Sequence, residues 1–501
     1  MSDVAVSFLD TTLRDGAQSL WASGIRHGMM AAVAEELDHA GFTHIELPVN
    51  PIFFKKMVRD LKENPWDIMR MLAQRITRTP TACMYSAYQN LNTFGTPTPP
   101  VLGELYTSLM ADIGVLDRAQ LTANTADQLT RTFPREVPYL KGLGMEIALA
   151  LAYTESPRHT DEYYAQKARQ AAAFQPDAIY LKDQGGLLTP ERLKTLLPVI
   201  LAEAGDIPVE VHSHCTTGLA PLVYLEALEL GVRTLHTGIP PLANGSAQPS
   251  VLEVAANARA LGYTTDIDEE RVRAVSGMLR QFARRDGLPE GQTTPYSAAQ
   301  FQHQIPGGVI SNLTFQLAEI GIEDRLDEVL EECIRIRHEL GYPIMITPYS
   351  QYVCTQAAVN VATGERYGNV IDPIIRLAQG DFGEDSGYLW MDENLRDDFL
   401  SRPRAKELAQ HVARPLDDVT LSEAREMYGH PGISDEDLVL RAIVQSTTAI
   451  DDMYRAGPPA SYSAESRPSM VSLLESIAEH PRLNYISIRK NNDVVTVSKT
   501  Q

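Results

Sequence analysis

The sequence of 501 residues contains only four cysteines, and no two of them stand in a Cys-x-x-Cys pair: Cys83, Cys215, Cys333 and Cys354. Cysteines this sparse and widely spaced exclude a disulfide scaffold and a zinc ribbon, and they favour a reducing compartment. Basic residues are also in deficit, because 44 Lys and Arg against 65 Asp and Glu give a formal net charge of −21. A chain this acidic is a poor partner for nucleic acid or an anionic membrane surface.

Long apolar runs are missing as well. The longest, such as residues 147–152, are far too short to cross a bilayer. The first residues, Met-Ser-Asp-Val-Ala-Val, lack the basic and apolar segments typical of a signal peptide. We therefore expect a cytoplasmic protein with no membrane span.

Eight short strand-like runs alternate with helical segments over the first 300 residues: 4–9, 44–47, 81–85, 114–116, 146–152, 178–181, 209–212 and 234–237. Eight βα units predict a parallel sheet, and a closed (β/α)8 TIM barrel accommodates eight strands without leaving an open edge. An open, doubly wound sheet is the alternative. Thr189-Pro190 is typical of a helix start, with Pro in the first turn.

From about residue 300 the pattern becomes mainly helical. Residues 324–340 have the apolar spacing of an amphipathic helix, and further helical stretches continue to about Arg455. Residues 456–468 have the composition of a linker, and two short runs near the end of the sequence predict a hairpin. We therefore expect three parts: a barrel with the active site at 1–300, a helical domain at 301–456, and a linker with a small hairpin at 457–501.

Polar side chains gather where the predicted strands end, at the barrel face on which active sites are built. Arg14, Asp15 and Gln18 follow the first strand, and His212 and His214 stand at the end of the seventh. Residues two apart in a strand point to the same side, so the two imidazoles can bind one metal ion, with Asp15 as an oxygen ligand. A single His-x-His is more often structural, but the added carboxylate strengthens the prediction.

Lys182, at the end of the sixth strand, has two interpretations. A salt bridge to Asp183 or another acid is the simpler one from spacing alone. Alternatively, its neutral amine captures carbon dioxide as a carbamate, which would turn a cation into an anionic metal ligand. Burial at the barrel mouth would favour the neutral amine that this chemistry requires.

Two further positions carry weaker signals. Ser311 follows Gly307-Gly308 and can relay a proton, although from the residues alone helix capping before Asn312-Leu313 is the preferred explanation. Tyr85 ends the third strand, where it can contact a substrate or pack in the core.

Several motifs recur in the order known from one family: DTTLRDGAQSL (10–20), YTESPRHT (153–160), LKDQGGLL (181–188) and VHSHCTTG (211–218). QPS (248–250), PGG (306–308), SNL (311–313), TPYSQ (347–351), TQA (355–357) and GERY (364–367) follow. The chain thereby resembles, over about residues 4–455, the carboxyltransferase domain shared by pyruvate carboxylase, the oxaloacetate decarboxylase α subunit and the carboxyl-transfer subunit of transcarboxylase.

The resemblance implies a (β/α)8 barrel followed by a helical domain, assembled as a homodimer. It implies a divalent metal held by Asp15, His212, His214 and a carbamylated Lys182, with zinc favoured and cobalt or manganese as alternatives. Arg14 and Gln18 would contact the substrate. Ser311 would move a proton between the substrate carbon and the nitrogen of biotin. The implied activity is a biotin-dependent transfer of a carboxyl group to or from an enolisable small acid.

The chain departs from this family in its substrate pocket. The strand-three segment, in which the family carries a carboxylate-clamping arginine, has none between Met84 and Asn90, and the second strand is followed by Leu-Pro-Val-Asn instead of Cys-Trp-Gly-Gly. Ala17 stands where the family has His, Cys215 where it has Asp, and His236 where Asp is common. These departures favour an acid other than pyruvate, or pyruvate with rebuilt contacts.

The sequence also lacks a Met-Lys-Met biotinylation motif, and its terminal hairpin is too short for a biotinyl domain. We therefore expect biotin to arrive on a separate carrier protein that a separate biotin carboxylase loads. Residues 11–18 also resemble the start of metal-dependent carbon–carbon lyases such as isopropylmalate synthase and hydroxymethylglutaryl-coenzyme A lyase, but those use no carbamate. A third alternative, a non-catalytic scaffold subunit, is disfavoured by the intact metal ligands.

Overall fold

The computed structural model describes residues 4–88, 90–92, 97–122, 128–383, 386–410, 416–462, 485–490 and 493–498. Within these ranges the side chains of Ser311, Asn312, Phe315 and Gln410, and most of those in the last two ranges, are outside the described part.

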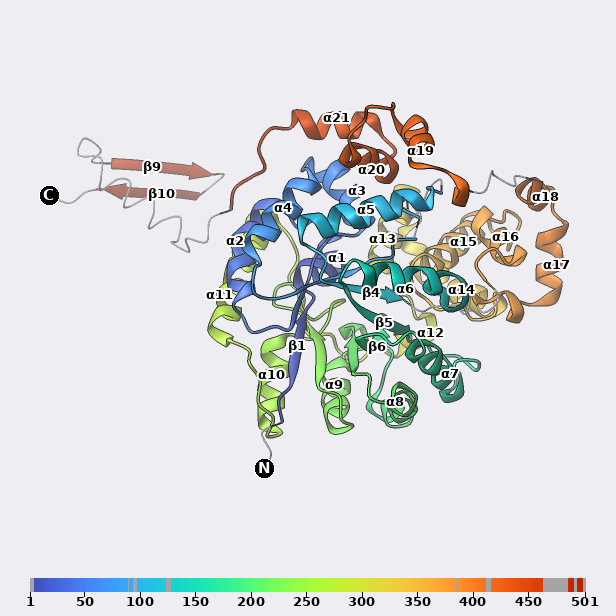
Figure 1. The fold of residues 1–501 in the computed structure, drawn as a ribbon, viewed down its shortest axis with the longest axis horizontal. Coiled ribbons are helices and arrows are strands. Elements are labelled where there is room, and N and C mark those ends of the chain that lie inside the picture. The colour runs from blue at the N-terminus through green and yellow to red at the C-terminus, as the bar shows by residue number, and fades with distance from the viewer. Residues whose placement is uncertain are drawn as a thin grey trace. The chain divides into compact units, whose positions relative to one another are not determined.

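The N-terminal part is a closed barrel of eight parallel strands in sequence order. Figure 1 shows barrel strands with helices around them. The strands are β1 (Ser7–Asp10), β2 (His44–Glu46), β3 (Thr81–Met84), β4 (Arg118–Thr122), β5 (Glu146–Ala152), β6 (Ala178–Asp183), β7 (Val209–Ser213) and β8 (Thr234–Thr237). β8 pairs with β1 and closes the sheet. The predicted TIM barrel is therefore confirmed, and the open sheet is wrong.

The helices between the strands surround the barrel: α1 (Ala17–Trp21), α2 (His27–Asp38), α3 (Pro51–Lys56), α4 (Pro65–Arg75), α5 (Pro100–Ile113), α6 (Phe133–Gly142), α7 (Asp161–Ala172), α8 (Pro190–Ala204), α9 (Ala220–Glu229), α10 (Val251–Ala260) and α11 (Glu269–Asp286). α8 starts as predicted, because the Thr189 hydroxyl accepts a hydrogen bond from the Arg192 backbone N–H at 3.0 Å.

The fourth predicted strand is wrong. Residues 114–116 form the turn after α5, which ends at Gly114 with a positive φ of 82°. The apolar side chains of Val115 and Leu116 are buried without belonging to a strand. β4 begins two residues later with Arg118, whose buried guanidinium binds Glu210 at 2.7 Å. A strand whose polar side chains face the barrel interior does not show the apolar pattern on which the prediction relied.

The described residues between 298 and 455 are mainly helical, as predicted, and form α12 (Ala298–His303), α13 (Gly307–Glu319), α14 (Leu326–Glu339), α15 (Tyr349–Thr363), α16 (Asp372–Gln379), α17 (Glu393–Ser401), α18 (Pro403–Gln410), α19 (Leu421–Tyr428), α20 (Asp435–Val444) and α21 (Thr447–Arg455). α13 to α17 enclose a second apolar core. α13 also contacts α1, at the end of the barrel where β1 finishes.

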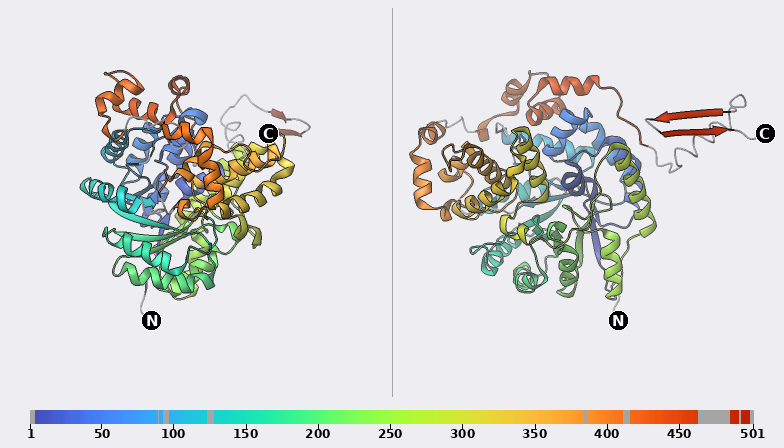
Figure 2. Two further views of the ribbon diagram at one scale, coloured as in Figure 1. Left: turned by 90° about the vertical axis from the view of Figure 1, so that its right-hand side faces the viewer. Right: turned by 180° about the vertical axis from the view of Figure 1, so that it is seen from behind.

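The last of these helices return to the barrel. α20 packs against α3 and α5, so its orange-red ribbon lies beside the blue helices in both views of Figure 2. The Trp66 indole N–H of α4 also donates to the Glu436 carbonyl of α20, at 3.3 Å.

Residues 461–501 form a separate unit. Within it, β9 (Tyr485–Lys490) and β10 (Asp493–Ser498) pair antiparallel. Among the helices that the structure describes, none combines the length and apolar character needed to cross a bilayer.

Candidate active site

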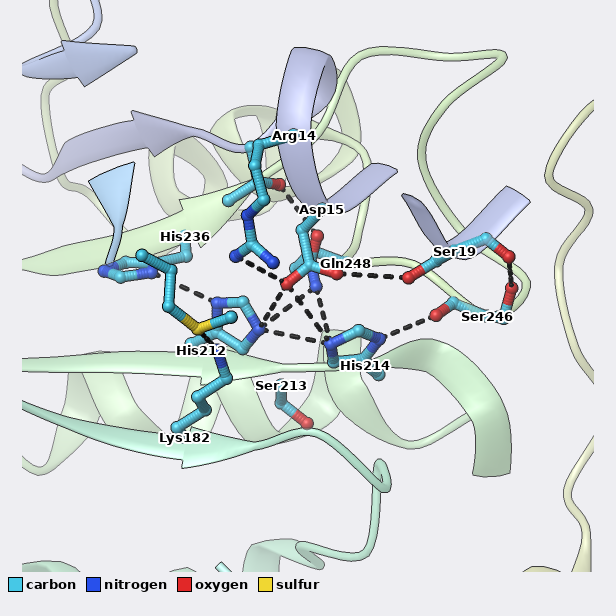
Figure 3. Close-up of polar contacts among 12 residues, drawn as sticks. Arg14, Asp15, Ser19, Lys182, His212, Ser213, His214, His236, Ser246 and Gln248 are labelled. Atoms are coloured by element: carbon cyan, nitrogen blue, oxygen red, sulfur yellow. Dashed lines mark hydrogen bonds and ion pairs between the residues drawn. The ribbon is translucent and has the colours of Figure 1, made fainter. Parts of the chain in front are cut away.

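Three predicted metal ligands meet at the carboxyl end of the barrel (Figure 3). Asp15 lies in a π-helical turn, Thr12–Gly16, just after β1, while His212 is the last residue but one of β7 and His214 directly follows the strand. The Nε2 atoms of the two histidines are 3.2 Å apart, and they lie 3.4 and 3.7 Å from Asp15 Oδ2. All three side chains are buried. The fold therefore brings together the three residues that the sequence proposed as ligands.

The protonation states of Asp15 and His212 suit metal binding. Burial would raise the pKa of Asp15, but the charge of Arg14 holds it well below its ordinary value. Burial, assisted by the charge of Lys182, lowers the pKa of His212 well below its ordinary value. The cluster therefore holds an ionised carboxylate and a neutral His212 imidazole, the forms that bind divalent ions.

The amide of Gln248 lies between the two imidazoles. Its Nε2 is 3.1 Å from His212 Nε2 and 2.9 Å from His214 Nε2, so it donates to both lone pairs. The Thr11 hydroxyl donates to Gln248 Oε1 at 2.7 Å. We gave this glutamine no role from the sequence, where it was only one residue of a recurring motif.

Lys182 lies beside this cluster, because it is the register partner of His212 across β6 and β7. Its Nζ is 2.7 Å from the sulfur of Met84, which is a weak acceptor. Burial first, and then the charge of Arg14, lower the pKa of Lys182 to about 8. No described carboxylate forms an ion pair with this amine. The Asp183 carboxylate binds Ser213 Oγ at 2.8 Å and two backbone N–H groups instead, so the salt-bridge interpretation is wrong.

Arg14 links the metal cluster to β2. One terminal nitrogen of its buried guanidinium lies 2.9 Å from Asp15 Oδ2 and 2.6 Å from Glu46 Oε1. The Arg14 Nε and Gln18 Oε1 are buried without a hydrogen-bond partner among the described residues. Because unpaired buried polar atoms are costly, these two atoms indicate where a bound ligand would make hydrogen bonds.

The structure does not bring Tyr85 to this cluster. Its hydroxyl donates to the Gly103 carbonyl of α5 at 3.0 Å and accepts from Thr107 Oγ1 at 2.9 Å, and its ring packs edge-on against Tyr106. Met84, its neighbour, faces the interior, so Tyr85 points to the helical layer. Core packing, one of the two interpretations of Tyr85, is the one this geometry supports.

Ser311 falls in the second turn of α13, which begins at Gly307, so it cannot cap that helix. Its side chain lies outside the described part. Gly307 does permit a close approach: a Cβ atom there would be 2.6 Å from the Ser246 Cβ. α13 is thereby held against the loop that carries Ser246.

Behind His212 lies a buried chain of polar groups that the sequence did not reveal. His236 Nδ1 is 3.2 Å from His212 Nδ1, and His236 Nε2 is 2.9 Å from Glu210 Oε2. Burial would raise the pKa of Glu210, but Arg118 and the hydrogen bond from His236 lower it to about 2. One sequence pattern could have indicated this group. Glu210 and His212 stand two residues apart in a strand, so they share one face, which is the inner face of β7, opposite Arg118.

Two family models match the chain. The model described as "Conserved carboxylase domain" matches residues 301–449, and the one described as "HMGL-like" matches residues 111–279. The chain is 33% identical over 382 residues to a pyruvate carboxylase subunit of Methanocaldococcus jannaschii, covering 76% of this chain and 66% of that protein. It is 28% identical over 407 residues to the 2-oxoglutarate carboxylase large subunit of Hydrogenobacter thermophilus, covering 81% of this chain and 59% of that protein.

Among solved structures, the carboxyl transferase domain of Rhizobium etli pyruvate carboxylase with pyruvate shares the fold, with a TM-score of 0.78 and 21% identity over 91% of this chain and 77% of that one. Among the sequence relatives, the matched region of this chain spans just under two thirds of the length of the M. jannaschii protein and a smaller share of the H. thermophilus protein. By these matches the chain belongs to the family of carboxyltransferase domains found in pyruvate carboxylase, the oxaloacetate decarboxylase α subunit and transcarboxylase.

Proposed function

We propose that this chain is the carboxyltransferase subunit of a biotin-dependent carboxylase or decarboxylase. In the carboxylating direction, the carboxyl group leaves the ring nitrogen of carboxybiotin and a carbon–carbon bond forms at the acidic carbon of a small acid. The proton from that carbon ends on the biotin nitrogen, and Ser311 is the proposed relay. Decarboxylation is the same path reversed.

The observation that carries this proposal is the position of Lys182 next to the Asp15–His212–His214 cluster. Two imidazole lone pairs and a carboxylate oxygen face one another within 4.8 Å, an arrangement that a divalent cation would stabilise. A buried lysine with no carboxylate partner among the described residues suits carbamate formation, in which the neutral amine adds to carbon dioxide and releases a proton. The carbamate would be an anionic fourth ligand. A carbon–carbon lyase of the alternative class has no use for this lysine.

A divalent ion held here would supply Lewis-acid polarisation to a carbonyl oxygen. The residues of this chain would do the rest. Arg14, fixed by Asp15 and Glu46, has its Nε available to donate, and Gln18 has an unpaired Oε1. Both would orient the acid and stabilise the charge that develops on its enolate oxygen.

The substrate is proposed to be an enolisable acid, with pyruvate disfavoured. The segment after β3 contributes Met84 to the site and Tyr85 to the core, with no arginine between them and Asn90. Arg135, which contacts this segment, is stacked over the Tyr88 ring at 4.3 Å and paired with Glu104 at 2.6 Å. A carboxylate clamp of the pyruvate type would therefore need other residues. The relative that is named for 2-oxoglutarate supports a longer 2-oxo acid.

We further propose zinc as the ion, a separate biotinyl carrier and biotin carboxylase as partners, a homodimer, and a cytoplasmic location. The name of the M. jannaschii relative as a subunit supports the separate partners. The four cysteines are buried free thiols, as suits a reducing compartment. Streptavidin detection of covalent biotin on this chain would contradict the separate carrier.

A decarboxylation screen tests the function. The purified protein is incubated with free biotin and a panel of oxaloacetate, malonyl and methylmalonyl thioesters and longer 2-oxo diacids, and carbon dioxide release is measured. Lys182→Ala is the blank, and Lys182→Met is the matched control that keeps the volume of the side chain. Biotin-stimulated release from one acid, absent in both variants, is the expected result. Release that does not need biotin or Lys182 would instead indicate a lyase or a simple decarboxylase.

Calorimetry addresses the choice of acid separately. We expect no saturable heat with pyruvate. Pyruvate binding that disappears in Arg14→Ala would show that pyruvate is the substrate, held by rebuilt contacts.

A further inference from the structure

We infer that His236 and Glu210 are positioning residues that fix the tautomer of the metal ligand His212. This inference rests on the proposed metal site. His236 lies on the side of His212 away from Asp15 (Figure 3). Glu210 contacts the far nitrogen of His236, so neither residue would touch the ion.

The direction of each hydrogen bond in this series of side chains follows from Arg118, the member farthest from His212. Arg118 can only donate, and it donates to Glu210 Oε2 at 2.7 Å. The same oxygen lies 2.9 Å from His236 Nε2. A carboxylate accepts hydrogen bonds, so His236 carries its proton on Nε2.

The remaining proton positions then follow. An imidazole that carries its one proton on Nε2 presents a lone pair at Nδ1, and His236 Nδ1 lies 3.2 Å from His212 Nδ1. His212 must therefore donate from Nδ1. Its Nε2 is left with the lone pair that faces Asp15 Oδ2 at 3.4 Å.

Gln248 supports the same assignment from the other side. Its amide nitrogen lies 3.1 Å from His212 Nε2 and 2.9 Å from His214 Nε2, and an amide N–H needs a lone pair to donate to. His214 reaches this state more simply, because its Nδ1 donates to the Ser246 carbonyl at 2.6 Å. His214 is thus oriented by a backbone carbonyl. His212 is oriented by His236, which the buried ion pair of Arg118 and Glu210 holds.

Burial keeps this arrangement in place. His236 and His212 are 0% and 1% exposed, and Arg118 and Glu210 are 3% and 4% exposed. The His236 ring also packs against Tyr180, with ring centroids 5.1 Å apart. Outer groups that orient a ligating histidine typically change metal affinity about 10- to 100-fold when they are removed.

Zn²⁺ affinity, measured by competition with a chromophoric chelator on the full chain, tests this inference through three variants. His236→Phe keeps the ring but removes the acceptor for His212 Nδ1–H, and we expect about 10- to 100-fold weaker binding. His236→Asn keeps an acceptor near that position, and we expect it to bind nearly as tightly as the wild type. The matched control is His39→Gln, which removes a partly exposed histidine next to α2 whose Nδ1 lies 2.8 Å from the Glu35 carbonyl.

If His236 served only in packing, the order of the two Zn²⁺ affinities would be reversed, because Phe fills the space of the imidazole and Asn leaves a void. Wild-type affinity in His236→Phe, or equal losses in both His236 variants, would overturn the inference. The tautomer is measured separately in the metal-free protein, by two-bond ¹H–¹⁵N spectra of ¹⁵N-histidine-labelled chain, with signals assigned by the variants. A proton on His212 Nδ1 supports the inference, and a proton on its Nε2 overturns it. If the wild type binds no Zn²⁺, the proposed function fails, while the spectra still decide the tautomer.

Discussion

Gly307, at the start of α13, lies against Ser246, the residue whose carbonyl accepts the hydrogen bond from His214 Nδ1. A Cβ atom at Gly307 would be 2.6 Å from the Ser246 Cβ, closer than such atoms approach. The helical region after the barrel therefore supports His214, a proposed metal ligand, through one glycine contact. This contact joins two parts of the sequence that are about 60 residues apart.

Gly307→Ala tests this relationship. The added methyl group must displace Ser246, which would weaken the hydrogen bond that orients His214, and we expect Zn²⁺ affinity to fall about tenfold. Gly308→Ala is the matched control, because the nearest atom to a Cβ there is Ser19 Cα at 4.0 Å. Chelator competition on both variants measures the effect. Equal affinities for the two would show that Ser246 does not depend on this contact.

Tyr85→Phe separates packing from substrate binding. The structure uses the Tyr85 hydroxyl for hydrogen bonds to Gly103 and Thr107, away from the metal ligands. We expect the free energy of unfolding to fall by about 1 kcal/mol, with kcat and KM for the acid found in the screen unchanged. Urea denaturation and steady-state kinetics provide the two readouts. A raised KM at unchanged stability would restore the substrate-binding role that the sequence suggested.

His159 predicts a dependence of stability on pH. Burial, followed by the charges of Arg158, Arg337 and Lys167, lowers its pKa to about 2, far below the ordinary 6.5. The folded state favours the neutral imidazole, so this contribution is fully present above pH 6.5. It is lost as the pH falls below 6.5, at up to about 1.4 kcal/mol per pH unit.

Urea denaturation of the wild type and His159→Gln at pH 7.5, 6.5 and 5.5 measures this contribution. The variant lacks the titrating group, so its unfolding free energy should fall by about 1 kcal/mol less between pH 6.5 and 5.5. The other titrating groups, His303 among them, are common to both proteins and cancel in the comparison. Parallel pH profiles would show that His159 is not held neutral by the fold.

The sequence predicted the barrel well where strands are apolar and poorly where they carry interior charges. β5 reads EIALALA and matches its predicted bounds, whereas β4 reads RAQLT and was placed on the apolar turn before it. Arg118 and Gln120 are buried because Glu210 and the barrel interior accommodate polar groups. Such cross-barrel partners are a property of the closed sheet, and no single strand shows them.

The same limit applies to the site. Asp15, His212 and His214 were identifiable because each follows or ends a strand and carries a metal-binding group. The partners that set their state were not: Gln248 lies in a loop, and His236 and Glu210 come from strands whose neighbours are known only once the barrel closes. Met84 next to Lys182 was equally invisible, since β3 and β6 are not adjacent in the sheet.

We propose that Lys182, as a carbamate, completes a metal site with Asp15, His212 and His214. A crystal structure of the zinc-loaded protein, grown with bicarbonate and measured at the zinc absorption edge, tests it directly. We expect one anomalous peak about 2.0–2.2 Å from the three ligand atoms, with density for a carboxyl group on Lys182 Nζ reaching the same peak. An unmodified Lys182 still in contact with Met84, or an anomalous peak elsewhere, would contradict it.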